Sequence, residues 1–360
     1  MEHVINPFCI DVDPMERLLL INFEKDPDTT YVGFEPQVFD DPINGQGHLV
    51  IGWRQDGKVD VYHQAGLHLN PAKYDIAGKG LANLVERNLA GATYEVDAFG
   101  VQAHYAFRDL HDRPIVIDIS ERNPKARKPF GLLAPMGAAA EGPSALPLVL
   151  LHDFYFVRKR HTAFEVSIDG KRHQPDGLPI PMDFTRMTFT RYSPRPLIAT
   201  LNPAFEGRLD PIEVANGATE VHRGETTLAL EWREGQPALK RLTRRNEVYP
   251  LDVRFERAFP DIQSLANGAD LAGNFTIEGH PSTGHIAGIY TVAKRDRQIA
   301  VTMRPAQGWL PRPTKASLRF LYTVASVFRK WPTSYEWTAH IQAQGDDAYA
   351  MRSAWRRIYE

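Results

Sequence analysis

The sequence predicts a mainly β protein with two antiparallel β-barrel or β-sandwich domains and a few peripheral and C-terminal helices. Short segments of alternating hydrophobicity recur along most of the chain, and Asp-Gly and similar turn signals separate them at intervals of roughly 8–12 residues. The length of 360 residues exceeds the usual size of one hydrophobic core. These observations together favour two β domains over one.

The segment 48–64, HLVIGWRQDGKVDVYHQ, is the clearest strand pair. Asp56-Gly57 predicts a two-residue hairpin turn, because both central residues of such a turn need positive φ, which Asp and Gly tolerate. Pairing outward from this turn places Trp53 opposite Asp60. The resulting face is largely apolar but carries a carboxylate and a phenol, and it consists of Leu49, Ile51, Trp53, Asp60 and Tyr62.

The same pattern continues toward the C-terminus. Residues 93–120 predict three strands with breaks at Phe99-Gly100 and Asp112-Arg113, and Asp169-Gly170 predicts a second tight hairpin. With these, the chain contains about fifteen predicted strands. The remaining strand segments are 182–193, 226–243, 249–259, 271–280, 284–305 and 334–342.

Three segments have helical rather than strand periodicity. Residues 78–91 place apolar side chains at helical spacing and end in glycine, and residues 314–332 begin with Thr314 as a capping residue and stop at Pro332. Residues 346–360 are acidic at their start and basic at their end, which matches the helix macrodipole. We therefore expect helices in these three places.

The domain boundary is predicted near the middle of the chain. Residues 203–221 form a Pro- and Gly-containing break, which divides the chain into an N-terminal β domain, 1–205, and a C-terminal β domain with the terminal helices, 206–360. A second irregular segment, 121–147, is longer than ordinary connections and is expected to be a loop over a site or a disordered crossing.

Composition excludes several functional classes. The formal net charge is −2, so the general electrostatic basis for nucleic-acid binding is missing. Cys9 is the only cysteine, which excludes an intrachain disulfide and a thiolate metal cluster. The N-terminus lacks the apolar run of a secretory signal, and no segment reaches the length of a membrane-spanning helix. We expect a cytoplasmic protein without a membrane span; its oligomeric state stays open.

The sequence contains no motif for nucleotide binding, for serine hydrolase chemistry or for a zincin. There are 13 histidines but no His-x-His pair, and His280 and His285 fit a turn between strands better than a metal site. We therefore expect no cofactor and no metal.

The candidate site is the segment 148–161, LVLLHDFYFVRKRH, where an aliphatic run meets a polar cluster. On a strand, Asp153 and Tyr155 share a face, as Asp60 and Tyr62 do in the first hairpin. Desolvation raises a carboxyl pKa into the range of a usable acid or base, and a nearby phenol can orient it or donate a proton. The predicted catalytic residues are Asp153, Tyr155, Asp60, Tyr62 and His152, and the predicted substrate-binding residues are Trp53, Phe154, Arg158 and His161.

The length, the strand count and the segment LAGNFTIEGH resemble the tandem-lipocalin carotenoid 1,2-hydratases and AttH-like proteins, with Phe275 at the position of the lipocalin tryptophan. The resemblance implies two lipocalin-like domains. It implies a cofactor-independent lyase (hydratase) or isomerase/cyclase that acts on a hydrophobic, isoprenoid- or polyketide-like molecule in a β-barrel cavity. Two alternatives stay open: a carrier that binds a hydrophobic ligand without turnover, and a carbohydrate-active β-sandwich that uses Trp53, Trp232 and Trp309 as stacking platforms.

Overall fold

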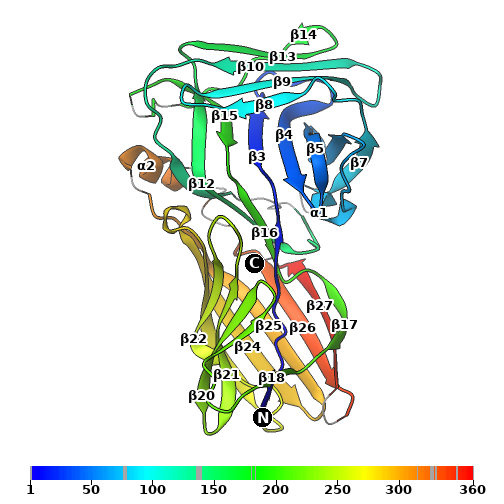
Figure 1. Ribbon diagram of the computed structural model, residues 1–360, viewed down its shortest axis with the longest axis vertical. Coiled ribbons are helices and arrows are strands. Elements are labelled where there is room, and N and C mark those ends of the chain that lie inside the picture. The colour runs from blue at the N-terminus through cyan, green and yellow to red at the C-terminus, as the bar shows by residue number, and fades with distance from the viewer. Residues whose placement is uncertain are drawn as a thin grey trace.

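The computed structural model describes residues 2–75, 79–134, 140–179, 181–182, 184–313, 315–324, 328, 331–345 and 348–359. Over these residues strands dominate, which confirms the predicted mainly β fold with few helices. The strands form two halves that are stacked along the long axis of the molecule (Figure 1). The chain crosses between the halves more than once, and the N-terminus lies at the far end of the C-terminal half.

A large sheet dominates the N-terminal half. Its strand order is β2-β16-β12-β15-β3-β4-β5-β6-β7, with β11 paired to β12. Neighbouring strands are antiparallel except β6 and β7, which run parallel. The strands are β2 (Ile10–Asp13), β3 (Arg17–Asn22), β4 (Tyr31–Asp41), β5 (Gly45–Arg54), β6 (Val59–His63), β7 (Leu81–Glu86), β11 (Phe130–Ala134), β12 (Leu146–Arg158), β15 (Met187–Ser193) and β16 (Leu197–Leu201).

A five-stranded antiparallel sheet covers one face of the large sheet. Its order is β14-β13-β10-β9-β8, and a shared core of buried aliphatic and aromatic side chains joins the two sheets. The predicted breaks in 93–120 are confirmed, and Asp169 and Gly170 form the predicted tight turn with φ of 52° and 75°. The strands are β8 (Thr93–Val96), β9 (Val101–Arg108), β10 (Pro114–Glu121), β13 (Thr162–Ile168) and β14 (Lys171–Arg172).

The C-terminal half is a ten-stranded antiparallel sheet of order β17-β27-β26-β25-β24-β23-β22-β21-β20-β19. A separate pair, β1 (Glu2–Val4) with β18 (Ile212–Val214), lies beside it. The strands are β17 (Phe205–Leu209), β19 (Glu220–Arg223), β20 (Thr226–Arg233), β21 (Gln236–Arg244), β22 (Leu251–Phe259), β23 (Asp270–Glu278), β24 (His285–Arg295), β25 (Gln298–Leu310), β26 (Tyr335–Ala343) and β27 (Tyr349–Arg357).

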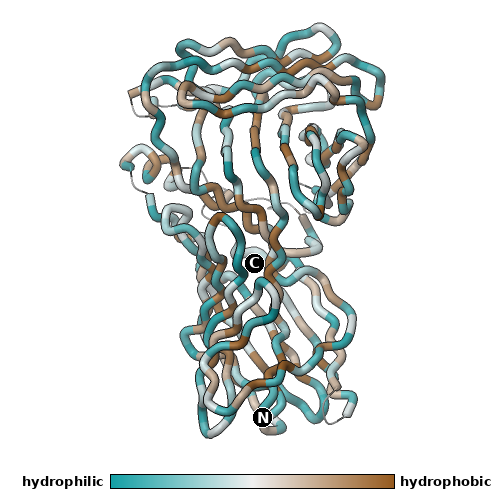
Figure 2. Tube along the Cα trace, viewed as in Figure 1, coloured by the Kyte–Doolittle hydropathy of each residue, from teal (hydrophilic) through white to brown (hydrophobic). Residues whose placement is uncertain are grey.

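Buried apolar side chains pack together on the inner face of the C-terminal sheet. The ring of Phe8, from the N-terminal segment, lies 4.8 Å from Phe259, 5.1 Å from Phe255 and 5.6 Å from Trp337. The same apolar core continues across the junction to β12 and β16, where apolar residues gather in Figure 2. Phe8, near the start of the chain, therefore packs in the core of the C-terminal half.

Two predicted helices are strands. Residues 81–86 of the segment 78–91 form β7, and residues 349–357 of the segment 346–360 form β27. In β27 buried and more exposed residues alternate, which is the two-residue period of a strand with one face on a core. Pairing within the sheets, of β7 with β6 and of β27 with both β17 and β26, has therefore overridden the helical pattern, and the closing C-terminal helix is a wrong prediction.

The described helices are short: α1 (Pro71–Asp75), the 3₁₀ helix η1 (Pro281–Thr283) and α2 (Ala316–Val324). The helix predicted in 314–332 is confirmed over α2, while its expected cap, Thr314, lies outside the described residues. In Figure 1, α2 lies beside β12 at the junction of the halves. No helix in the described ranges has the length and the apolar character that crossing a membrane requires.

The first hairpin has a different register from the predicted one. Four residues, 55–58, connect β5 and β6, because the Gly57 amide donates to the Arg54 carbonyl at 3.0 Å and only Gly57 has positive φ, 84°. Trp53 therefore pairs with Val59, and Asp60 pairs with Gly52. This shift by one residue separates Trp53 from Asp60 and turns them to opposite faces of the sheet.

Candidate functional site

A pocket of about 470 Å³ lies on the face of the large sheet that the five-stranded sheet does not cover. Its volume falls within the range of small-molecule sites. The lining comes from β3, β4, β5, β12, β15 and β16, and α2 of the C-terminal half contributes Leu318, Leu321 and Tyr322. Aliphatic and aromatic side chains make up most of the wall, for example Leu20, Ile51, Leu151, Phe154, Phe156 and Phe189.

Glu35 is a buried carboxyl group in this apolar wall. Its side chain is only 2% exposed, and it projects from β4 toward the pocket. Gln37 Nε2 donates to Glu35 Oε1 at 2.7 Å, and Trp53 Nε1 donates to Glu35 Oε2 at 3.1 Å. Burial raises the pKa of Glu35 to about 7, although these two donors and the positive charge of Arg191 lower it. Glu35 can therefore accept or release a proton near neutral pH.

The position of Glu35 follows from the pairing of β4. Glu35 lies opposite Ile51, and Gly33 lies opposite Trp53, so Glu35, Gln37 and Trp53 share one face of the sheet. Sequence reasoning missed Glu35. A signal was present in YVGFEPQVF, where two polar residues occupy alternate positions of an otherwise apolar strand. Such a pair on a buried face needs partners or a function.

Arg191 on β15 places a guanidinium group in the same pocket. One of its nitrogens, Nη1, donates to the Phe189 carbonyl at 3.0 Å and to Asn22 Oδ1. Its guanidinium carbon lies 4.4 Å from the centre of the Phe189 ring. Burial lowers the pKa of Arg191 to about 10, while Glu35 and Glu24 act in the opposite direction. The group keeps its charge at neutral pH.

A phenol and an ion pair add further polar groups to the pocket. Tyr74 of α1 is 7% exposed, and burial raises its pKa, with smaller contributions from the charges of Asp13 and Glu35. Lys73 Nζ lies 2.7 Å from Asp13 Oδ1 at the margin of the pocket. The pocket therefore combines an apolar wall with four carboxyl groups, two phenols and two cations, namely Asp11, Asp13, Glu24 and Glu35, Tyr74 and Tyr322, and Lys73 and Arg191.

Helix α2 covers part of the pocket. Tyr322 Oη donates to the Gly131 carbonyl of β11 at 2.6 Å. The Tyr322 ring lies 5.0 Å from Trp309 and 5.2 Å from Phe328. These contacts hold an element of the C-terminal half over a site built on the N-terminal sheet, so both halves shape the pocket.

Of the predicted site residues, Trp53 and Phe154 line the pocket, and the predicted catalytic residues do not. Asp60 and Tyr62 lie on the other face of the sheet, where both are fully buried against the five-stranded sheet. Asp60 accepts hydrogen bonds from Asn83 Nδ2 at 2.7 Å, from Tyr31 Oη at 3.1 Å and from Arg54 Nη1 at 3.1 Å.

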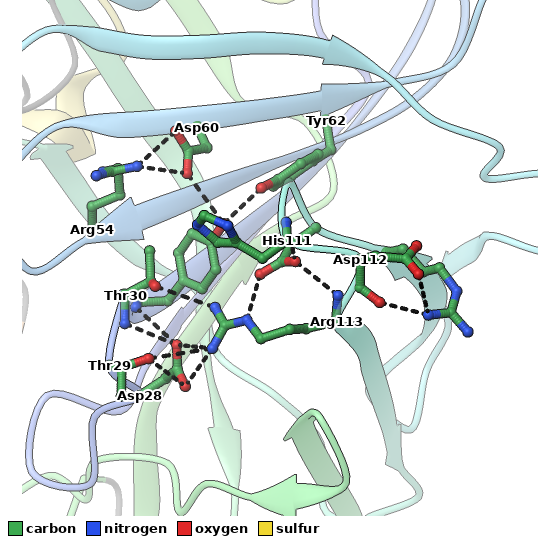
Figure 3. A network of polar contacts seen from close by, with 12 residues as sticks. Asp28, Thr29, Thr30, Arg54, Asp60, Tyr62, His111, Asp112 and Arg113 are labelled. Carbon is green, nitrogen blue, oxygen red and sulfur yellow. Dashed lines mark hydrogen bonds and ion pairs between the residues drawn. The ribbon is translucent and has the colours of Figure 1, made fainter.

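Figure 3 shows this network, with Asp60 beside Arg54 and near Tyr62. Tyr31 and Tyr62 place their hydroxyl oxygens 2.6 Å apart, and burial raises the pKa of Tyr62 to about 12. Arg113 bridges Asp28 at 3.1 Å and Asp109 at 2.8 Å, and Figure 3 shows Arg113 beside Asp28. Every charged group here has a partner, so the network stabilises the contact between the sheets.

Asp153 and Tyr155 share a face of β12, as the sequence predicts for a strand, but they lie outside the pocket. Tyr155 Oη donates to Asp153 Oδ1 at 2.6 Å, and Arg195 Nη2 lies 3.2 Å from Asp153 Oδ2. Burial, followed by the hydrogen bond to Asp153, raises the pKa of Tyr155 to about 12. Arg127 stacks on the Tyr155 ring at 4.6 Å.

Arg158 and His161 also lie away from the pocket. Arg158 is buried and forms an ion pair with Glu121, with Nε 2.6 Å from Oε1. Its remaining nitrogens donate to the carbonyls of Phe99, Asn123 and Lys125, so the side chain is fully used within the protein. His161 is an exposed turn residue with φ of 61°.

His152 packs at the junction of the two halves. Its ring lies 5.1 Å from the rings of both Tyr249 and His280. Burial lowers the pKa of His152, and the neighbouring His280 acts in the same direction. In the part of the chain that the structure describes, no three His, Cys, Asp or Glu side chains gather in an arrangement that could hold a metal ion.

Comparison of the chain with protein-family models, curated proteins and solved structures finds no match.

Proposed function

We propose that the protein is a cofactor-independent enzyme that transfers protons on a hydrophobic small molecule, as a lyase (hydratase) or an isomerase/cyclase. The observation that supports this proposal is the Glu35 carboxyl group, with a pKa of about 7, in the apolar wall of the pocket. A general acid or base works best when its pKa lies near the operating pH. The proposal includes the tandem arrangement of two lipocalin-like β domains that the sequence resemblance implies.

Glu35 would be the proton-transferring residue, and Trp53 and Gln37 would position it. Both donors contact the carboxylate oxygens directly, so they fix its orientation and stabilise its ionised form. The phenol of Tyr74 is a second donor that opens into the pocket, and it could hydrogen-bond a polar atom of the substrate. The apolar wall would bind the hydrocarbon part and exclude water.

A carrier of hydrophobic ligands is the alternative, and the mostly apolar wall favours it. A carrier, however, needs no titratable group in this wall. A buried carboxyl group with a raised pKa destabilises the fold at neutral pH, and such groups are concentrated at functional sites. Glu35 therefore supports the enzyme over the carrier.

The test uses the apolar metabolite extract of the source cells in D₂O, with mass spectrometry of the products. Wild-type protein should convert one compound by adding or removing water, or by isomerisation with uptake of deuterium. Glu35→Gln should lower this rate by about 100-fold or more, the usual contribution of a general acid or base. Asp153→Asn is the matched control, because Asp153 is a carboxylate outside the pocket.

Native mass spectrometry of the same proteins measures binding separately. Retention of a compound without its conversion would identify a carrier. Equal conversion by wild type and Glu35→Gln would show that Glu35 is not the proton-transferring residue.

A further inference from the structure

Arg191 has donors that the protein does not use. A guanidinium group carries five N–H donors, and only those on Nη1 have acceptors in the protein. Nε and Nη2 are not among the fully buried polar atoms without a partner, so they are accessible. Because Arg191 lines the pocket, we place these two donors at the pocket or its mouth. In the described part of the chain no carboxylate forms an ion pair with Arg191.

Two buried or half-buried arginines of this half, Arg158 and Arg113, are paired with carboxylates, whereas Arg87 and Arg127 donate to carbonyl and hydroxyl oxygens. Arg158 forms an ion pair with Glu121 at 2.6 Å, and Arg113 does so with two carboxylates. Buried and half-buried charges are normally paired, because desolvation is costly without a partner. Arg191 instead stacks on the Phe189 ring and lines the pocket together with apolar side chains.

We propose that Arg191 binds an oxyanion head group of the substrate, either a carboxylate or a carbonyl that becomes an enolate. The planar guanidinium edge formed by Nε and Nη2 matches two oxygens of such a group. The hydrocarbon tail would then lie along the apolar wall made by β12, β16 and α2. This assignment rests on the proposed function of the pocket and adds the class of its substrate.

The position of Arg191 also selects among the proposed reaction types. A fixed positive charge destabilises a developing carbocation and stabilises a developing oxyanion. Glu35 would take the proton from the carbon next to the carbonyl, the C–H electron pair would form the C=C bond, and the carbonyl electrons would move onto the oxygen at Arg191. Return of the proton to another carbon completes an isomerisation without any oxidant or reductant.

The experiment compares three probes of equal chain length: dodecanoate, dodecanol and dodecylamine. Their dissociation constants are measured by calorimetry at pH 6, where Glu35 is mostly neutral. Wild type should bind dodecanoate about 10-fold or more tighter than dodecanol, as expected for a charge-assisted hydrogen bond, and should bind dodecylamine weakest. Arg191→Met should make dodecanoate and dodecanol equal, and Arg191→Lys should keep part of the preference.

Arg195→Met is the matched control. Arg195 is an arginine of the same half with a 69% exposed side chain, and it does not line the pocket. It should leave all three dissociation constants unchanged. Equal binding of dodecanoate and dodecanol by wild type would overturn the proposal, whatever the folding of the variants. A carboxylate preference that survives in Arg191→Met would also overturn it.

Glu35→Gln separates this proposal from the enzymatic one. Its preference for dodecanoate over dodecanol should equal or exceed that of wild type, because the head group contacts Arg191. If that preference is present but conversion does not depend on Glu35, the head-group assignment stands and the proton-transferring role of Glu35 fails. If conversion depends on Glu35 but dodecanoate binds no more tightly than dodecanol, the enzymatic proposal stands and the head-group assignment fails.

Discussion

Trp53 Nε1 lies 3.1 Å from Glu35 Oε2, and this hydrogen bond joins neighbouring strands on the pocket face of the large sheet. Gln37 binds the other carboxylate oxygen at 2.7 Å. Two neutral donors stabilise the ionised form but do not outweigh burial, so the pKa stays near 7. Glu35 is therefore held in one orientation while it keeps the capacity to titrate near neutral pH.

This raised pKa predicts a pH-dependent cost in stability. Between the ordinary pKa of 4.5 and the folded value of about 7, the folded protein holds a proton that the unfolded chain has released. The free energy of unfolding therefore falls as pH rises through this window. Above pH 7 it has fallen by the full amount of about 3 kcal/mol. Glu35→Gln removes the titration, so we expect this variant to be more stable than wild type at pH 8.

Urea denaturation at pH 5 and pH 8 measures this difference. The stability gain of Glu35→Gln over wild type should grow from under about 1 kcal/mol at pH 5 to about 3 kcal/mol at pH 8. Asp153→Asn provides the comparison for a carboxylate outside the pocket. A gain that is the same at both pH values would contradict the raised pKa.

Asp60 is expected to stabilise the fold without taking part in the pocket. Asp60→Asn keeps the size of the side chain but removes the charge that pairs with Arg54 and accepts from Tyr31 and Asn83. We expect a loss of about 2 kcal/mol in unfolding free energy, typical of buried hydrogen bonds to a charged group. Dodecanoate binding should be unchanged. Weaker dodecanoate binding by a folded Asp60→Asn would link this network to the pocket.

Strands joined by local turns could be predicted from the sequence, whereas β7 and β27 have helical patterns and were not. Asp169-Gly170 joins β13 and β14 in the predicted way, since both residues take positive φ. Asp56-Gly57 gave the wrong register, since only Gly57 does so and the connection is longer. A local dipeptide cannot show this difference, and one residue of register reverses the face of every side chain.

The candidate site could be predicted only in part. Trp53 and Phe154 reach the pocket, because large apolar residues on a strand tend toward a cavity wall or a core. The Asp-x-Tyr pairs predict acids at Asp60 and Asp153, but Asp60 pairs with Arg54 of the same hairpin and Asp153 pairs with Arg195, which follows β15. Such pairs form only in the folded chain, so the sequence did not separate them from Glu35.

The hydrogen bond between α2 and β11 is expected to limit local opening of α2, which covers part of the pocket. Tyr322→Phe removes the 2.6 Å hydrogen bond to the Gly131 carbonyl and leaves the ring in place. The loss of about 1 kcal/mol should raise amide exchange in α2 about fivefold. Hydrogen-exchange mass spectrometry measures it, with Tyr290→Phe as the control, because Tyr290 donates at 2.6 Å within the C-terminal half. Equal α2 exchange in the two variants would contradict this role.

Binding of dodecanoate should weaken as pH rises from 6 to 8. Glu35 ionises near pH 7, and its negative charge then repels a carboxylate held at Arg191. The other charged groups that line the pocket are Asp11, Glu24 and the Asp13–Lys73 ion pair. We expect the dissociation constant to rise by about 10-fold, equivalent to one unit in the pKa of Glu35. Glu35→Gln should bind dodecanoate equally at both pH values, and dodecanol should show no pH dependence in either protein. A pH dependence that persists in Glu35→Gln would assign the titration to another group.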